Sequence, residues 1–240
     1  MLMETIRAEK VTKAFGRTYA LKEITLTIAT GEFVGLFGPN GAGKSTFLRI
    51  CAALIRPTAG RLLVRGKDVW KNLTMRGEIG FLSHAIGLYP NLTVTENLLY
   101  FAKLSALKDP VRRVDEVIDK LDMATYAGME VGRLSRGWQQ RAAIARGLLN
   151  DPQILLWDEP FTGLDEIATR MILGLLDDFR AQGRSAIISS HDFSRTMEVC
   201  GRAIMIDRGR IEYDGAGVDV ADAYRRIMSV RAGTSTAETA

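Results

Sequence analysis

The first part of the chain alternates apolar and polar positions, which is typical of strands with one face toward water. We predict two such strands at residues 6–11 and 21–28, paired antiparallel. Residues 32–37 are mostly apolar and run into glycines, so we expect a short buried strand and then a helix at 45–55. An apolar run bounded by glycines predicts a further hairpin at 60–68.

The pattern becomes helical between about residues 93 and 150, because apolar side chains recur there every three or four positions. Three helices are expected in this stretch, at 97–104, 111–121 and 139–149. Since strand patterns flank it on both sides, we interpret it as a helical insertion into an α/β core.

Strand and helix patterns alternate after the insertion, which indicates βαβ connections and a mostly parallel sheet. The predicted strands are at 154–157, 186–189 and 203–206, and the predicted helices are at 165–182 and 193–200.

The length of 240 residues suits one α/β domain with an inserted subdomain. We expect a single domain over residues 1–225, with the core in 1–84 and 151–225 and the helical subdomain in 85–150. The residues at 226–240 are small and polar, so a flexible tail is predicted there.

The charge pattern excludes some partners. Lys and Arg are scattered and the formal net charge is only +4, so no nucleic-acid partner is expected. No apolar run approaches the ~18 residues that cross a bilayer, and the chain starts without a signal-peptide pattern. We therefore expect a cytoplasmic protein.

The two cysteines, Cys51 and Cys200, form no CxxC pair, so we expect buried, reduced thiols.

A glycine-rich loop lies between the buried strand and the helix that follows it. Gly38, Gly43, Lys44 and Ser45 satisfy the pattern GxxxxGK followed by Ser or Thr. Glycines let successive N–H groups surround a phosphate, and the helix N-terminus adds positive potential. Lys44 is expected to reach the outer phosphates and Ser45 to ligate Mg²⁺. The residues predicted to bind the nucleotide here are Gly38, Pro39, Asn40, Gly41, Ala42, Gly43, Lys44, Ser45 and Thr46. The alternative is a glycine turn beside a surface lysine.

Two acidic residues end the apolar run at 154–157. Asp158 is placed at the carboxyl edge of the predicted sheet, where ligands of such folds collect, and is expected to hold Mg²⁺. Glu159 is placed to orient or deprotonate the water that attacks the terminal phosphate. Two acids after a strand are also common in solvated loops, and the phosphate loop is what favours the catalytic interpretation.

The segment Leu-Ser-Arg-Gly-Trp that begins at Leu134 resembles LSGGQ, the signature of ABC ATPases. Leu134, Ser135 and Gly137 match, whereas Arg136 and Trp138 replace Gly and Gln. The resemblance implies a RecA-like P-loop NTPase core, and it implies that Ser135 and Gly137 face the ATP bound by an opposite subunit. Ser135 alone is also compatible with a simple helix cap.

Three further positions fit this resemblance, which covers about residues 4–213. The Thr-Gly-Leu-Asp segment ending at Asp165 looks like the loop that crosses between subunits, and His191 looks like the switch histidine that contacts the terminal phosphate. Phe15 matches the aromatic residue on which adenine stacks, with Tyr19 as the competing candidate.

His84 stands where the family normally has a glutamine that contacts Mg²⁺ and the attacking water. Only two histidines occur in the chain, His84 and His191, and both fall at site positions of the family. Histidine titrates near neutral pH, so we hypothesise that coupling to the membrane partner depends on pH.

The resemblance implies an ATP-hydrolysing subunit that uses ATP and Mg²⁺ and works as a homodimer or with a second ABC cassette. It also implies a membrane-spanning permease as partner, which places the chain on the inner face of the cell membrane. A soluble ABC ATPase of DNA repair or translation is one alternative, although those are typically twin cassettes or carry a long coiled coil. A phosphate-loop kinase or GTPase is another, but it would leave the signature and His191 unexplained.

Among transporters, the runs at 81–90, 134–140 and 158–165 are similar to ATPases of the haem exporter used in cytochrome c maturation. His84 is the main reason for this comparison. The alternative is a generic exporter of the ABC-2 kind, because substrate choice resides in the membrane chain.

Overall fold

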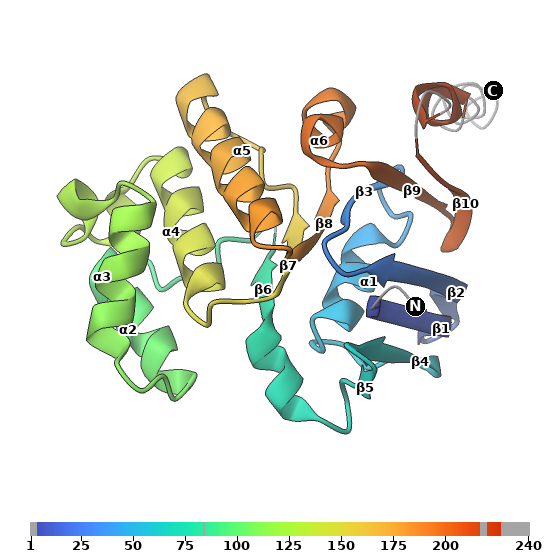
Figure 1. Cartoon of the computed structure of the whole chain (residues 1–240), viewed down its shortest axis with the longest axis horizontal. Helices are drawn as coiled ribbons and strands as arrows, with labels where there is room; N and C mark the ends of the chain where they lie inside the picture. Colours follow the sequence, from blue (N-terminus) through green and yellow to red (C-terminus); the bar gives the residue numbers. More distant parts are fainter. Residues whose placement is uncertain (1–3, 84, 217–219, 227–240) are drawn as a thin grey trace.

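The computed structural model describes residues 4–83, 85–216 and 220–226. An antiparallel sheet lies at one end of the molecule and a group of helices at the other, with a larger sheet between them (Figure 1). The antiparallel sheet has the strand order β2-β1-β4-β5. Its strands are β1 (Glu4–Phe15), β2 (Thr18–Ala29), β4 (Ala59–Val64) and β5 (Lys67–Asp68).

The central sheet has the order β10-β9-β3-β8-β7-β6 and is parallel except for the β9–β10 pair. Its strands are β3 (Phe33–Phe37), β6 (Ile79–Leu82), β7 (Ile154–Asp158), β8 (Ser185–Ser189), β9 (Arg202–Asp207) and β10 (Arg210–Gly215). The predicted α/β fold, with a mostly parallel core and an N-terminal antiparallel sheet, is therefore confirmed.

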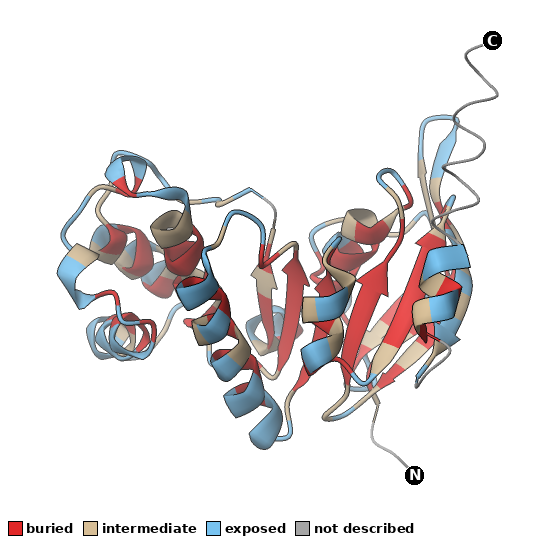
Figure 2. Ribbon diagram, turned by 90° about the horizontal axis from the view of Figure 1, so that it is seen from above, coloured by how far each residue is buried: buried red, intermediate tan, exposed pale blue. Residues whose placement is uncertain are grey.

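Alternate residues of the central strands belong to two different cores, as a period of two requires. Leu36 and Leu156 pack with Phe47 and Leu48 of helix α1 (Lys44–Cys51) and with the antiparallel sheet. On the opposite face, Trp157 packs toward helices α4 (Arg136–Leu148) and α5 (Glu166–Ala181). Buried residues fill the central strands and the sides of the helices that face them (Figure 2). The sheet is thus covered on both faces, which explains its nearly continuous apolar strands.

The helical end of the molecule contains α2 (Val94–Leu104), α3 (Pro110–Lys120) and α4. Thr93 begins α2 with a capping box, because its hydroxyl accepts from the Glu96 N–H while the Glu96 carboxylate accepts from the Thr93 N–H. Short 3-10 turns occur at Leu73–Glu78, Ala124–Tyr126 and Val131–Arg133. Helix α6 (Phe193–Val199) and a helical segment at 220–226 lie near the last strands of the central sheet (Figure 1).

Several boundaries differ from the sequence prediction. The predicted helix 45–55 ends at Cys51, because Ala53 has a left-handed φ of +55° that a continuing helix does not allow. Helix α4 starts at Arg136 and not at 139, and strands β6 and β10 were not predicted. Cys51 and Cys200 are buried free thiols, as predicted.

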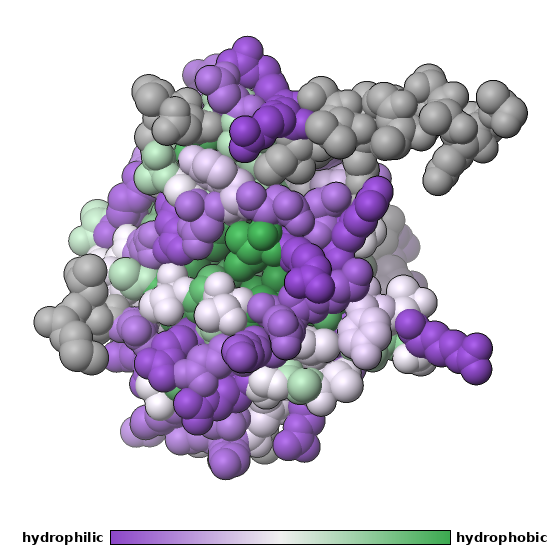
Figure 3. Space-filling model, turned by 90° about the vertical axis from the view of Figure 1, so that its right-hand side faces the viewer, coloured by the Kyte–Doolittle hydropathy of each residue, from purple (hydrophilic) through white to green (hydrophobic). Residues whose placement is uncertain are grey.

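One side of the molecule, where β1, β2 and β10 come to the surface, is mostly hydrophilic with a small apolar recess near its centre (Figure 3). In the described part of the chain, no helix has the length and apolar character needed to span a membrane.

Candidate functional site

A cleft of about 600 Å³ opens at the carboxyl ends of β3 and β7, where the phosphate loop and the two predicted carboxylates meet. Parallel α/β sheets usually bind ligands at this edge. The lining residues are Ala20, Asn40, Gly41, Ala42, Gly43, Lys44, Ser45, Thr46, Arg49, Asp158, Glu159, Thr162 and His191. Segments far apart in sequence thus form one site, and the lining includes Arg49, which sequence analysis did not single out.

The path of the phosphate loop depends on glycines. Gly38, Gly41 and Gly43 have φ values of +145°, +76° and +114°, which side chains rarely allow. A Cβ atom at Gly38 would lie 2.0 Å from the Ile206 carbonyl oxygen on β9, and one at Gly43 would lie 2.6 Å from the Ala20 carbonyl oxygen. The loop is therefore folded against neighbouring backbone, in the curled conformation by which such loops surround an anion.

Lys44, the first residue of α1, is held inside this loop. Its Nζ donates to the carbonyl oxygens of Gly38 at 2.6 Å and Pro39 at 3.2 Å. Burial lowers the pKa of Lys44, and the nearby carboxylates of Glu159 and Asp158 oppose that shift. The carbonyl groups of the phosphate loop therefore hold the Lys44 ammonium group in the cleft, near the carboxylates of Glu159 and Asp158.

Asp158 ends β7 as a buried carboxylate. It accepts a 2.5 Å hydrogen bond from the hydroxyl of Ser189, the last residue of the adjacent strand β8. Sequence analysis did not assign a role to Ser189, although it lies only two residues before His191. The serine fixes one oxygen of the carboxylate and thereby orients the other.

Asp158 and Ser45 line the same cleft and supply the hard oxygen ligands that Mg²⁺ prefers. Among the described residues, no group of three or more His, Cys, Asp or Glu side chains forms a metal site. Two protein ligands and phosphate oxygens are the usual arrangement for Mg²⁺, so these residues fit a nucleotide-bound ion.

Glu159 has the left-handed φ of +57°, unusual for a residue with a side chain. Its N–H donates to the Ser189 carbonyl oxygen at 2.9 Å, which locks this conformation beside the sheet. Its Oε2 accepts from the His191 N–H at 3.2 Å and from the Thr162 hydroxyl at 3.5 Å. Its Oε1 is buried, accepts no hydrogen bond from the described residues, and lies 3.4 Å from His191 Nε2. The structure therefore pairs Glu159 with His191 at the mouth of the cleft.

Ser135, Gly137 and Asp165 are not among the described residues that line the cleft. Asp165 caps α5, because its carboxylate accepts from the Ala168 N–H at 2.7 Å. Ser135 occupies the N-cap position of α4, yet its side chain makes no capping hydrogen bond. The start of α4 instead packs against the loop before Asp165, with the Arg136 Cγ atom 3.3 Å from a Cβ placed at Gly163.

These features coincide with those of a known family. The sequence model described as ABC transporter matches residues 21–162. The chain belongs to the ABC transporter family. ABC transporter ATP-binding protein NatA of Bacillus subtilis is 37% identical over 201 residues, which cover 82% of this chain and 82% of NatA. Lipopolysaccharide export system ATP-binding protein LptB of Haemophilus influenzae is 32% identical over 216 residues, which cover 87% of this chain and 89% of LptB.

Solved structures agree with this assignment. A dimeric ATP-binding cassette in a post-hydrolysis state, bound to ADP and Pi, shares 31% identity with a TM-score of 0.78. The match covers 88% of this chain and 98% of that chain. This chain is therefore an ATPase of the ABC type with the P-loop NTPase fold, as predicted.

The departure at Trp138 has a structural explanation in this cassette. The Trp138 ring packs on Tyr126 with ring centroids 4.0 Å apart, and the Arg141 guanidinium lies 4.4 Å from the Trp138 ring centroid. The next residue, Gln139, donates from Nε2 to the carbonyl oxygens of Val131 and Leu134 at 3.0 and 3.2 Å. Trp138 thus anchors the start of α4 inside the helical part of the cassette.

The candidates for adenine stacking are not among the described residues that line the cleft. Phe15 is 52% exposed with the Lys13 ammonium 4.9 Å from its ring centroid, and Tyr19 is 56% exposed. Ala20, next to Tyr19, does line the cleft. Both aromatics are therefore accessible on the β1–β2 hairpin near the cleft. His84 lies outside the described residues.

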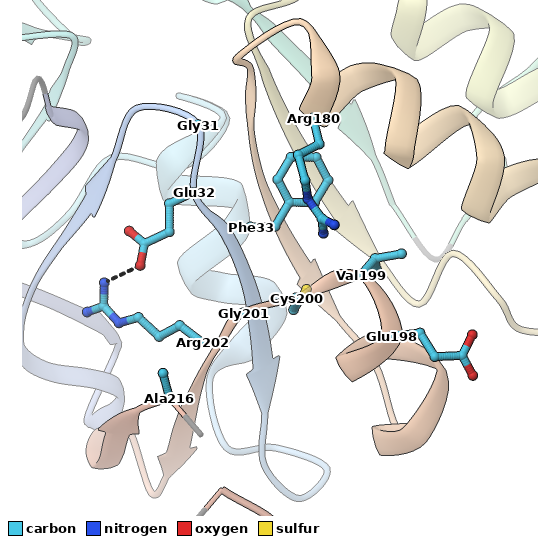
Figure 4. Close-up of a pocket in the computed structure, with 10 residues that line it drawn as sticks. All are labelled: Gly31, Glu32, Phe33, Arg180, Glu198, Val199, Cys200, Gly201, Arg202 and Ala216. Atoms are coloured by element: carbon cyan, nitrogen blue, oxygen red, sulfur yellow. Dashed lines mark hydrogen bonds and ion pairs between the residues drawn. The ribbon is translucent and has the colours of Figure 1, made fainter. Parts of the chain in front are cut away.

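A second hollow of about 490 Å³ lies near the start of β3 and β9 (Figure 4). Arg180 is stacked on Phe33, with the guanidinium carbon 4.6 Å from the ring centroid. Glu32 and Arg202 form an ion pair at 3.0 Å. This hollow is at the opposite end of the strands from Asp158 and does not contain the residues of the phosphate loop, so it is not part of the nucleotide site.

Proposed function

We propose that this chain is the ATP-hydrolysing subunit of a membrane exporter, and that its two ATP sites are each shared between two cassettes. The proposal rests on one observation above all. Lys44, Asp158, Glu159 and His191 meet in one cleft, whereas Ser135 lies apart with a hydroxyl that its own helix does not use. A cassette with this arrangement holds half of each site.

The geometry of the half-site supports the following roles for its residues. The loop from Gly38 to Thr46 and the Lys44 ammonium bind the phosphates, and Ser45 and Asp158 hold Mg²⁺. The ion, when bound, neutralises charge that develops on the phosphate oxygens. Glu159 takes the proton of the attacking water.

His191 lines the same cleft next to Glu159. Its N–H and Nε2 both face the Glu159 carboxylate, at 3.2 and 3.4 Å. A side chain in this place orients Glu159 toward the water and reaches the terminal phosphate. Phe15 or Tyr19 supplies the adenine contact.

The second half of each site comes from another cassette, either a second copy of this chain or a related one. Ser135, Gly137 and the N-terminus of α4 would contact the terminal phosphate, with Asp165 crossing the interface. ATP then favours the closed pair and hydrolysis favours the open pair, so the free energy of ATP drives motion through differential affinity.

The permease contact is proposed at the helical end of the core. A hollow of about 390 Å³ lies between the core and the helices, lined by apolar side chains such as Leu54, Phe81 and Phe101. Beside it, Tyr89 and Tyr100 pack edge to face with centroids 5.3 Å apart, yet both are exposed. This surface would take a short helix of the permease.

A fixed loop supports the proposed permease contact. The buried Asn97 side chain accepts from the Tyr89 N–H and donates to the carbonyl oxygens of Tyr89, Leu92 and Thr93. These hydrogen bonds hold residues 89–93 on α2, so a displacement of the helical part would move the proposed permease surface with it.

For the cargo, the haem exporter of cytochrome c maturation and a generic ABC-2 exporter remain the two candidates. The haem assignment rests on the sequence around His84, whereas the name of LptB states lipopolysaccharide export. The proposed location is the cytoplasmic face of the membrane, bound to the permease. The proposed domain boundaries are those of the sequence analysis, with one domain at 1–225 and a tail at 226–240.

The test is purification of the full-length chain from its own cells in a mild detergent, followed by identification of bound proteins. We expect a membrane-spanning protein in near-stoichiometric amount. Tyr100→Ser should reduce its recovery without changing the ATPase activity of the isolated cassette, whereas Val111→Ser, an exposed position on α3, should not reduce it. Recovery of ribosomal or DNA-repair proteins in place of a membrane protein would support a soluble ABC ATPase and refute the proposal.

A further inference from the structure

Three aromatic rings connect the phosphate loop, the switch histidine and the helical segment at 220–226. Phe37 immediately precedes the phosphate loop, Phe193 follows His191 by two residues, and Tyr224 lies in the 220–226 segment. Phe193 and Tyr224 are stacked, with centroids 4.6 Å apart and an interplanar angle of 30°. Phe37 lies 5.1 Å from Phe193 and 5.7 Å from Tyr224. The three rings thus form one mutually contacting cluster behind the catalytic cleft.

The central sheet holds the Phe37 ring of this cluster in place. Phe37 is fully buried, and a Cβ at Gly35 would lie 2.6 Å from its ring, so only glycine there leaves room for it. Val220 and Ala223 are also buried against this cluster, together with Ala203 and Met205 of β9. The 220–226 segment is therefore packed on the sheet, and Tyr224 projects from it onto Phe193.

His191 itself is held loosely. Its side chain is 49% exposed, and its hydrogen bond and ion pair with described residues are both with Glu159. Two residues later, Phe193 is half-buried and begins α6, with Asp192 as the N-cap. Because burial fixes Phe193 better than His191, the position of the histidine depends on how firmly Phe193 is packed.

We propose that Tyr224 is a positioning residue for hydrolysis: by stacking on Phe193 it fixes the start of α6, and so holds His191 against Glu159. Phe37 is immobilised by the sheet with or without Tyr224, so the phosphate loop does not depend on this contact. Loss of the Tyr224 ring should therefore slow the chemical step and leave nucleotide binding intact. The inference rests on the proposed role of His191.

The location of the Tyr224 hydroxyl agrees with this arrangement. Partial burial raises the pKa of Tyr224, and the negative charges of Asp192 and Glu159 raise it further. Glu159 contacts His191, and Asp192 is the residue that follows His191 in the chain.

The test compares three variants of the full-length chain in steady-state ATP hydrolysis. Tyr224→Ala should lower kcat about five-fold and change KM for ATP less than about two-fold, because misplacing a catalytic group affects rate before affinity. Tyr224→Phe keeps the ring and should restore kcat. Tyr213→Ala is the matched control, because Tyr213 packs on the same cluster but makes no ring contact with Phe193 in the described structure. It should leave kcat unchanged.

A spectroscopic measurement shows whether the effect passes through His191. The chain has two histidines, so ¹⁵N-histidine labelling gives two imidazole spin systems, and His191→Ala assigns them. In Tyr224→Ala, the His191 resonances should shift or broaden while those of His84 stay in place. If Tyr224→Ala does not fold, Tyr224→Leu, which preserves apolar volume without a ring, replaces it in both experiments.

Two results separate the inference from the proposed function. If His191→Ala hydrolyses ATP at the full rate, the proposed role of His191 fails, and the inference fails with it. If His191→Ala is inactive but Tyr224→Ala shows unchanged kcat and unchanged His191 resonances, only the inference is overturned. Equal losses of kcat in Tyr224→Ala and Tyr213→Ala would also overturn it, because they would indicate general destabilisation.

Discussion

Replacement of Gly38 by alanine tests whether neighbouring backbone enforces the shape of the phosphate loop. The added methyl group would lie 2.0 Å from the Ile206 carbonyl oxygen and 3.3 Å from the Ala42 Cβ, at a φ of +145°. The oxygen belongs to β9 within the central sheet, so the loop must move away from the sheet. Occupying a conformation reserved for glycine costs about 1–3 kcal/mol, and overpacking costs about 1–3 kcal/mol more.

Gly41 provides the matched control. Its φ of +76° is also positive, but a Cβ there would meet nothing within 4 Å. Gly41→Ala should therefore cost only about 1 kcal/mol, from backbone conformation alone. We expect urea denaturation to show a free energy of unfolding lower by about 2–6 kcal/mol in Gly38→Ala than in the unaltered chain. Titration with a fluorescent ATP analogue should show weakened binding in the same variant.

The reasoning would be refuted by a Gly38→Ala protein whose unfolding free energy is no lower than that of Gly41→Ala. Unchanged affinity for the ATP analogue would contradict it as well. Either result would mean that the loop is free to shift away from β9 at little cost, and that its shape is set by the nucleotide.

Two other predictions concern the signature and the cysteines. Ser135→Ala should leave the melting temperature unchanged, since the Ser135 hydroxyl makes no capping hydrogen bond, but it should lower ATP turnover. Asp165→Ala should lower the free energy of unfolding in urea by about 1 kcal/mol, because the Asp165 carboxylate does cap its helix. A destabilised Ser135→Ala would show that the serine is a cap after all. Burial raises the pKa of both thiols, that of Cys200 to about 12, so Cys51 and Cys200 should resist alkylation at pH 8 until the chain is unfolded. A raised pKa in the folded state also makes the free energy of unfolding depend on pH. Because unfolded thiols ionise near pH 8.5, the stability that the protonated Cys200 thiol contributes is complete below that pH and declines as the pH rises toward 12. The free energy of unfolding measured in urea should therefore depend less on pH above 8.5 in Cys200→Ala than in the unaltered chain.

Local patterns were sufficient to predict the elements that carry the phosphate site. The strand before Gly38, the loop and the start of α1 are adjacent in sequence, so their glycines and apolar runs determine them together. The predicted end of α1 was wrong. The helix stops before Ala53, which is left-handed, and an alanine does not indicate that conformation as a glycine would. Strand β6 is only four residues long and packs on both faces, so it shows no alternation.

The parts of the site that sequence did not reveal depend on long-range contacts. Ser189 fixes Asp158 across two neighbouring strands, and nothing near Ser189 in sequence indicates that partner. Tyr224 meets Phe193 only because the chain returns to the sheet after β10. The alternative role for Ser135 as a cap was equally open from sequence, and only the geometry of α4 shows that its hydroxyl is not used that way.

The two residues that depart from the family signature pack against neighbouring segments. Trp138 replaces a glutamine and is packed on Tyr126 beneath the start of α4, while Arg136 lies along Gly163 of the neighbouring loop. Both residues connect the signature to adjacent segments.

The most direct test of the account measures ATP turnover and oligomeric state in Glu159→Gln beside Lys44→Ala. Glu159→Gln should bind ATP, elute as a dimer when ATP is present, and hydrolyse ATP about 10²- to 10⁴-fold more slowly, because it lacks the proton acceptor. Lys44→Ala should lose tight ATP binding and remain monomeric. A Glu159→Gln protein that hydrolyses ATP at the unaltered rate, or stays monomeric with ATP bound, would contradict the shared-site mechanism.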